Sequence, residues 1–238
     1  MTVAPLIAMK SSQAKSLEAI GKELDRRAHT YVNDVDTAHG RHIGYIVREG
    51  DEHPLPLDQA IDRRMGELVT ARAIRANQVR AMGFIVSSND HLREDKAVGF
   101  LEESIAWFAK RYGSENLLAA QIHLDEGTPH AHMWIAPVIH DEEKGVDRLC
   151  AKELFAPDKR RKNKEGQWEV VAQGTMSRLQ EDFYEQVSSK WGYERPLRRE
   201  QRAEGYRSLE AYKVHVGITR ELRREIVGLQ AEREQALE

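Results

Sequence analysis

Residues 121–138 read Gln-Ile-His-Leu-Asp-Glu-Gly-Thr-Pro-His-Ala-His-Met-Trp-Ile-Ala-Pro-Val, and this stretch decides the fold that the sequence predicts. The chain on both sides of it is apolar and strand-like, and a Gly-Thr-Pro turn separates the two halves. The expected structure is a hairpin of two neighbouring strands. Side chains two positions apart on a strand leave the same face, so His130 and His132 should lie together, with His123 facing them across the turn.

Three imidazoles that converge from two strands are typical ligands of a divalent metal ion. A single strand histidine is usually only a hydrogen-bonded polar residue. Here three stand with two acids among apolar neighbours, and each buried polar group without a partner costs roughly 1–3 kcal/mol. The sequence therefore predicts a metal site with His123, His130 and His132 as ligands. Glu126 is expected to be a further ligand or a base, and Asp125 to orient an imidazole from outside the ligand set.

The motif His-x-Asp-Glu-x-Thr-Pro-His-x-His, followed by an apolar strand that ends in proline, resembles the metal motif of the MobV-type relaxases. These plasmid mobilisation and recombination (Mob/Pre) enzymes are a branch of the HUH endonucleases. The motif matches at every defining position, and the resemblance extends over roughly residues 3–200. It implies an α/β (α+β) fold, with helices on an antiparallel HUH-type sheet. It also implies metal-dependent nicking and joining of DNA at a plasmid or mobile-element transfer origin, through a covalent 5′-phosphoprotein intermediate.

Enzymes of this family have their nucleophile motif in the N-terminal region, where a helix carries Lys-His-Asn-x-Arg ahead of a polar loop and a strand. The corresponding run here is Lys22-Glu-Leu-Asp-Arg26. Arg26 matches and is expected to steady the phosphate or the nucleophile. His42 opens the following strand and is expected to support the metal ligands from outside. Glu23 stands where the family has its catalytic histidine, so the nucleophile stays open.

A nucleophile that attacks a phosphodiester must form an adduct that can be reversed. Tyrosine does this in other HUH enzymes, so Tyr31 is the first candidate. His29 is the second, and Glu23 is the third because an acyl phosphate is labile to water. Each of the three, taken alone, is also an ordinary residue of a helix end or a solvated loop. The expected cofactor is a divalent ion, Mn²⁺ or Mg²⁺.

Further strands and helices are predicted around the histidine pair of strands. Apolar periodicity indicates strands at 3–9, 42–47 and 79–87, and helices at 11–27, 57–76, 95–112 and 176–191. This order suits an antiparallel sheet with helices covering one side.

The net charge of −3 argues mildly against a nucleic-acid binder, but a local basic patch is what captures phosphates. Five cations occur between 159 and 164, ahead of a tryptophan that can stack on a base. Such a run is by default a solvated segment, and a second basic patch follows near 198. The expected partner is single-stranded or hairpin origin DNA, and its predicted ligands are Lys159, Arg160, Arg161, Lys162, Lys164, Trp168, Arg198 and Arg199.

The chain is predicted to divide into a catalytic domain, residues 1–200, and a helical tail that resembles a coiled coil, residues 201–238. The tail could pair with a second copy as a homodimer. Its pattern is still running at Glu238, so a longer tail is expected in the full protein. The sequence has no run of 18 apolar residues, so no membrane span is predicted. The one cysteine, Cys150, fits a reducing cytoplasm.

Two other functions remain open on the sequence alone. A relaxase-like protein without its nucleophile would bind origin DNA and leave it uncut. A general metallohydrolase that attacks with metal-bound water would explain the histidines, but neither Arg26 nor the basic segment.

Overall fold

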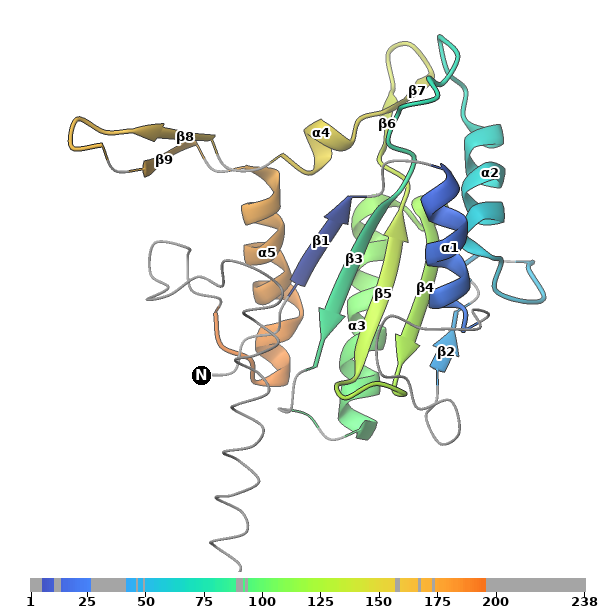
Figure 1. Ribbon diagram of the computed structural model, residues 1–238, viewed down its shortest axis with the longest axis horizontal. Helices are drawn as coiled ribbons and strands as arrows, with labels where there is room; N and C mark the ends of the chain where they lie inside the picture. Colours follow the sequence, from blue (N-terminus) through green and yellow to red (C-terminus); the bar gives the residue numbers. More distant parts are fainter. Residues whose placement is uncertain are drawn as a thin grey trace, which may run out of the picture. The chain divides into compact units, whose positions relative to one another are not determined.

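The computed structural model describes residues 6–10, 14–26, 42–45, 47–48, 50–88, 92, 94–156, 159–166, 168–172 and 174–195. Its centre is a sheet in the order β1-β3-β5-β4-β2, and every neighbouring pair is antiparallel (Figure 1). The predicted α+β fold with an antiparallel sheet is thereby confirmed. The five strands are β1 Leu6–Lys10, β2 His42–Gly44, β3 Met82–Ser87, β4 Leu117–His123 and β5 His130–Ile135.

One face of the sheet packs against α3 (Glu94–Tyr112), and α5 (Thr175–Gln186) completes this core. Alternate residues of the central strands, such as Ile122 and Met133, meet the apolar stripe of α3 that includes Phe108. All three are completely buried, and each burial stabilises the fold by about 1.5–3 kcal/mol. The helix predicted at 95–112 is therefore present, and its long apolar stripe explains why.

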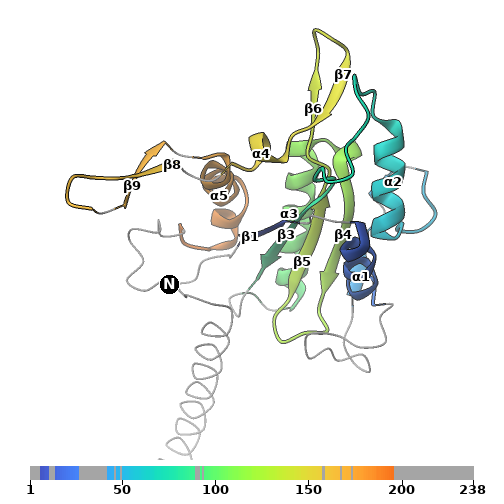
Figure 2. The same cartoon turned by 45° about the horizontal axis from the view of Figure 1, so that its top comes forward.

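The opposite face of the sheet is covered by α1 (Ala14–Leu24) and α2 (Leu57–Glu67). Leu24 and Ile61 pack with Trp134 of β5 in a second buried core. Figure 2 shows both helices on the side of the sheet away from α3. The expectation that helices cover one side only is therefore wrong. The burial of β4 agrees with two covering layers. Every one of its residues is buried, whereas a strand with one open face alternates between buried and exposed residues.

Helix α2 ends at Glu67 rather than at residue 76, so the expected buried stripe stops early. Val69 lies in the segment predicted to be helical, on its apolar stripe, but it is 61% exposed. Its backbone pairs instead with Asp147: the Val69 N–H donates to the carboxylate (3.0 Å), and the Asp147 N–H donates to the Val69 carbonyl (2.6 Å). These hydrogen bonds link Val69 to the hairpin at 138–149 and compete with continuation of the helix. Local periodicity does not show them.

Two antiparallel hairpins and three short helical segments complete the described residues. The basic segment at 159–164 lies in an antiparallel hairpin formed by β8 and β9. The helix expected at 176–191 divides into α5 and a 3₁₀ turn, η2. No helix of the described part is long and apolar enough to cross a membrane. The predicted tail, residues 201–238, lies outside the described residues. The remaining elements are β6 Val138–Asp141, β7 Val146–Leu149, β8 Lys159–Lys162, β9 Trp168–Ala172, α4 Ala151–Leu154, η1 Ser114–Asn116 and η2 Ser188–Trp191.

Candidate metal centre

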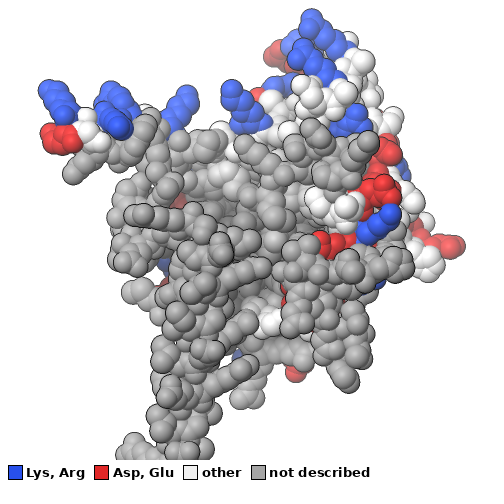
Figure 3. Space-filling model, in the orientation of Figure 1, with Lys and Arg blue, Asp and Glu red and all other residues white. Residues whose placement is uncertain are grey.

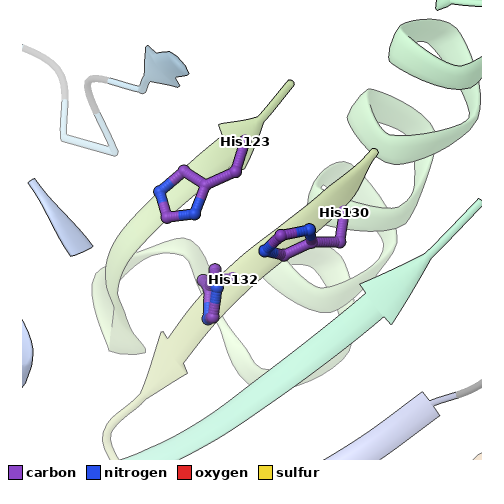
Figure 4. Close-up of side chains that lie close together, drawn as sticks. All are labelled: His123, His130 and His132. Carbon is purple, nitrogen blue, oxygen red and sulfur yellow. The ribbon is translucent and has the colours of Figure 1, made fainter. Parts of the chain in front are cut away.

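The register of the central strands brings three histidines together. His123, at the end of β4, lies directly opposite His130, at the start of β5, and His132 lies opposite Gln121. Residues opposite each other share a face, here the face covered by α1 and α2. The ring centroids are 4.9, 5.0 and 5.2 Å apart, and one nitrogen of each ring lies within 4.8 Å of those of the others. Figure 4 shows the three rings converging from the two strands.

Backbone carbonyls decide which ring nitrogen carries the proton in two of these histidines. His123 Nε2 lies 3.0 Å from the carbonyl oxygen of Leu24, and His130 Nδ1 lies 2.8 Å from that of Thr128. A carbonyl oxygen can only accept, so we assign the proton of the neutral ring to these nitrogens. The lone pairs are then on His123 Nδ1 and His130 Nε2. Those two atoms lie 3.8 and 3.9 Å from the same oxygen of Glu126.

Burial favours the neutral form of two of the imidazoles, those of His123 and His132. Desolvation lowers the pKa of His123 to about 3, and the charge of Arg26 and the ring of His130 add to the effect. Desolvation and the two neighbouring imidazoles hold the pKa of His132 well below its ordinary value. Neutral imidazole is the form that binds a metal, and ligand histidines usually donate their second N–H to a carbonyl or carboxylate. The side chains present therefore fit a divalent ion.

Arg26 holds both carboxylates beside the histidines. Its guanidinium donates from Nε and Nη2 to the two oxygens of Asp125, each at 2.6 Å, and from Nη2 to Glu126 Oε1 at 2.8 Å. Burial alone would raise the pKa of Asp125, but the hydrogen bonds and charge of Arg26 hold it below its ordinary value. Arg26 itself follows the end of α1 in a left-handed conformation, with φ at 55°. This turn aims the guanidinium at the acids.

The structure changes the expected role of Asp125. Its side chain was predicted to orient an imidazole, but its hydrogen-bond partner among the described residues is Arg26. Backbone carbonyls orient two of the imidazoles instead. Both acids lie close to an imidazole: one oxygen each of Asp125 and Glu126 is within 4.8 Å of a His123 nitrogen, and Glu126 Oε1 is also 3.9 Å from His130 Nε2.

We expect Arg26→Gln to lower the free energy of unfolding of the metal-free protein by about 3 kcal/mol at pH 7, because Asp125 would be left buried without its counter-charge. The side chains of Arg26 and Asp125 are only 8% and 5% exposed. Since Arg26 depresses the pKa of Asp125 below its unfolded value of about 3.9, this stabilisation is present above that value and is lost as the pH falls through the folded-state pKa. Urea unfolding at pH 7 and pH 3 measures the difference.

Arg63→Gln is the matched control for this measurement. Arg63 also makes a two-pronged pair with a carboxylate, Asp51, at 2.8 and 2.9 Å, but solvent reaches both side chains and screens them. Arg63→Gln should therefore lower the free energy of unfolding clearly less than Arg26→Gln does. The stabilising role of the buried Arg26–Asp125 pair would be contradicted if the two variants lost equal free energy of unfolding. It would also be contradicted if the loss in Arg26→Gln did not shrink at low pH.

The remaining predicted catalytic residues are only partly within the described chain. Glu23 lies in the last turn of α1, half-buried, and its carbonyl oxygen accepts a hydrogen bond from Arg26 Nη1 at 3.3 Å. His42 is paired in register with His123, so it occupies the next position along the same row of the sheet. Tyr31 and His29 lie outside the described residues.

The predicted DNA ligands lie mainly on the β8–β9 hairpin, where Figure 3 shows a concentration of cations. Arg161 of this hairpin pairs with Glu169 of the neighbouring strand at 3.0 Å. The exposed cations are Lys159, Arg161, Lys162 and Lys164. The backbones of Arg160 and Trp168 also lie in the hairpin, but their side chains are not described. Arg198 and Arg199 lie outside the described residues.

Sequence reasoning missed the groups that hold the imidazoles. The carbonyls of Leu24 and Thr128 carry no side-chain signal, and the approach of α1 to β4 is not visible in local periodicity. Gln121 was also missed, although its position two residues before His123 already places it on the histidine face.

Comparison with known proteins places the chain among plasmid recombination enzymes. Residues 3–206 match the family described as "Plasmid recombination enzyme", Mob_Pre. A plasmid recombination enzyme of Bacillus thuringiensis is 28% identical over 155 residues, which cover 63% of this chain and 33% of the relative. One of Streptococcus agalactiae is 30% identical over 151 residues, which cover 62% and 29%. The matched part of the chain thus spans about a third of the length of these curated relatives.

A solved structure has the same fold. The relaxase domain of MobM, in a Mn-bound crystal structure with plasmid pMV158 oriT DNA, matches with a TM-score of 0.64 and 23% identity. The match covers 88% of this chain and 98% of that domain. Since the family match extends over most of the sequence, the protein belongs to the Mob/Pre family of plasmid recombination enzymes.

Proposed function

We propose that this protein is a metal-dependent relaxase that nicks and rejoins one DNA strand at a transfer origin. The observation that carries the proposal is the convergence of His123, His130 and His132 beside Glu126, with Arg26 fixing the acid. Membership of the plasmid recombination family supports it. The Mn-bound, oriT-bound state of the MobM domain supports the choice of metal and of DNA.

In this proposal the ion, Mn²⁺ or Mg²⁺, is held by His123 Nδ1, His130 Nε2 and one nitrogen of His132. When bound, it would neutralise charge that develops on the scissile phosphate. Glu126 is a further ligand or the base that prepares the nucleophile. Its oxygen lies within 4 Å of two imidazole nitrogens, which suits both roles. Arg26 keeps this carboxylate in place.

The proposed nucleophile comes from residues 23–31, with Tyr31 first, then His29 and Glu23. For Tyr31, the phenol oxygen bonds to phosphorus, its proton passes to Glu126, and the bond from phosphorus to the 3′ oxygen breaks. The 3′ oxygen takes up a proton and leaves as a hydroxyl. The phosphodiester energy is kept in the tyrosyl linkage, so the reverse attack rejoins the strand without ATP.

A specific observation favours one alternative, a protein that binds origin DNA without cutting it. Glu23 occupies the place of the family's catalytic histidine. A relaxation assay with Mn²⁺ and a supercoiled plasmid carrying the DNA that flanks this protein's own gene separates the functions. The relaxase produces nicked DNA covalently joined to protein. Intact bound DNA would indicate the binding protein, and cut DNA without an adduct would indicate a metallohydrolase.

The β8–β9 hairpin is proposed to hold single-stranded DNA. Neutralising Lys159, Arg160, Arg161 and Lys162 to glutamine should weaken binding and flatten its dependence on salt. Each lost phosphate contact should reduce the log–log slope by about 0.7. Fluorescence anisotropy with a labelled oligonucleotide over a salt series measures both quantities.

The control for the hairpin replaces exposed lysines on α3, which packs on the sheet face opposite the histidines. Lys96→Gln with Lys110→Gln should leave the slope unchanged. If the hairpin variant also keeps its affinity and slope, the segment is only a solvated loop.

A further inference from the structure

On the histidine face, the His132 ring and the amide oxygen of Gln121 have no hydrogen bond to any described residue. His123 and His130 each donate to a backbone carbonyl, whereas the ring of His132 makes no hydrogen bond among the described residues. The residue opposite His132 on β4 is Gln121, which is only 4% exposed. Its Oε1 is buried and accepts no hydrogen bond from the part of the chain that the structure describes. An acceptor without a donor, Gln121 Oε1, and a ring that can donate, His132, therefore lie opposite each other on adjacent strands.

A hydrogen bond to α1 fixes the orientation of the Gln121 amide. Its Nε2 donates to the carboxylate of Asp25, directly after α1. Only the nitrogen side of an amide can donate, so Oε1 is the atom directed away from Asp25. Leaving such an oxygen buried without a donor costs about 1–3 kcal/mol. Buried polar atoms of this kind call for a partner, and a metal-bound state would supply one.

We propose that Gln121 is a positioning residue of the metal centre, whose Oε1 accepts the N–H of His132 when that ring holds the ion. A coordinating neutral imidazole uses one nitrogen for the metal and carries its proton on the other. Side chains opposite each other on antiparallel strands have Cβ atoms about 4.5–5.5 Å apart, which brings the amide within reach. All three imidazoles would then donate to a protein oxygen. This inference rests on the proposed metal-dependent function.

Trp134 is the competing donor, because its Nε1 is also buried and has no hydrogen-bond partner among the described residues. Its indole, however, lies over Gly83 of β3, where an added Cβ would come within 2.9 Å of the ring. In the sheet, β3 and β4 lie on opposite sides of β5. The indole is thus directed toward β3, while Gln121 is on β4. The geometry favours His132 as the donor.

Calorimetric titration of the metal-free protein with Mn²⁺ tests the proposal first. Gln121→Met keeps the length of the side chain but removes both the Oε1 acceptor and the Nε2 donor to Asp25. It should weaken Mn²⁺ binding about 10- to 100-fold, as loss of an outer partner of a ligand usually does. The thermal midpoint without metal should change little. Gln78→Met is the matched control, because Gln78 donates to the carbonyl of Leu149, outside the histidine face, and it should bind Mn²⁺ like the wild type.

Nitrogen-15 NMR of the Zn²⁺-loaded protein tests the hydrogen bond itself. The His132 N–H should exchange slowly with water in the wild type and rapidly in Gln121→Met, with the N–H signals of His123 and His130 unchanged. Equal Mn²⁺ affinities, an unaltered His132 signal, or a Trp134→Phe variant that reproduces both effects would overturn the role of Gln121. A wild type that binds neither ion would overturn the proposed function as well, so the two failures are distinguishable.

Discussion

His130→Ala is expected to abolish metal binding and DNA cleavage while leaving the metal-free fold intact. His130 is central to the cluster, because it lies opposite His123 in register and shares a strand face with His132. Its removal takes away a proposed ligand, so the loss of Mn²⁺ affinity should exceed the roughly 100-fold cost of losing an outer partner. Calorimetry and a nicking assay measure the two losses, and circular dichroism measures the fold.

His140→Ala is the matched control for His130→Ala. His140 is exposed on β6 and pairs with Asp147, and it does not belong to the cluster. This variant should bind Mn²⁺ and cleave DNA like the wild type. Cleavage by His130→Ala at near wild-type rates with added metal would remove the basis of the proposed site.

The second large effect concerns the nucleophile. Tyr31→Phe is expected to eliminate the covalent DNA–protein adduct, because a phenyl ring has no oxygen to bond to phosphorus. His29→Ala should retain the adduct. Denaturing gels of reactions with Mn²⁺ and an origin oligonucleotide measure it. Full adduct formation by Tyr31→Phe would exclude Tyr31, and its loss in His29→Ala would point to a phosphoramidate at His29. If both variants retain the adduct, the attacker is Glu23 or a residue outside 23–31.

The histidine cluster was predictable because its geometry is local. A two-residue spacing on a strand places His130 and His132 on one face, and a short turn brings His123 opposite them. The helix at 95–112 was predictable for a similar reason, since a long segment with an apolar stripe at helical spacing has few alternatives; the observed α3 has nineteen residues. The metal role of the histidines stays a prediction, which the titrations above test.

The features that sequence reasoning missed depend on contacts between distant segments. Arg26 reaches acids that follow it by about a hundred residues, so no local pattern links them. The early end of α2 depends on the backbone of Asp147 in a later hairpin. The second covering layer of helices could have been inferred from the sequence of β4, Leu-Leu-Ala-Ala-Gln-Ile-His, which begins with four consecutive apolar residues, because an open sheet face requires polar alternation.

Mass spectrometry of a trapped adduct tests the central claim most directly. The full chain would be incubated with Mn²⁺ and a suicide oligonucleotide whose fragment 5′ of the nick, which carries the free 3′-hydroxyl, is short enough to dissociate after cleavage. The trapped protein would then be digested and sequenced by fragmentation. The account predicts a 5′-phosphorylated DNA fragment bonded to one side chain between residues 23 and 31, with Tyr31 expected first, and no adduct in the His130→Ala variant. Intact DNA, or cut DNA with unmodified protein, would contradict it.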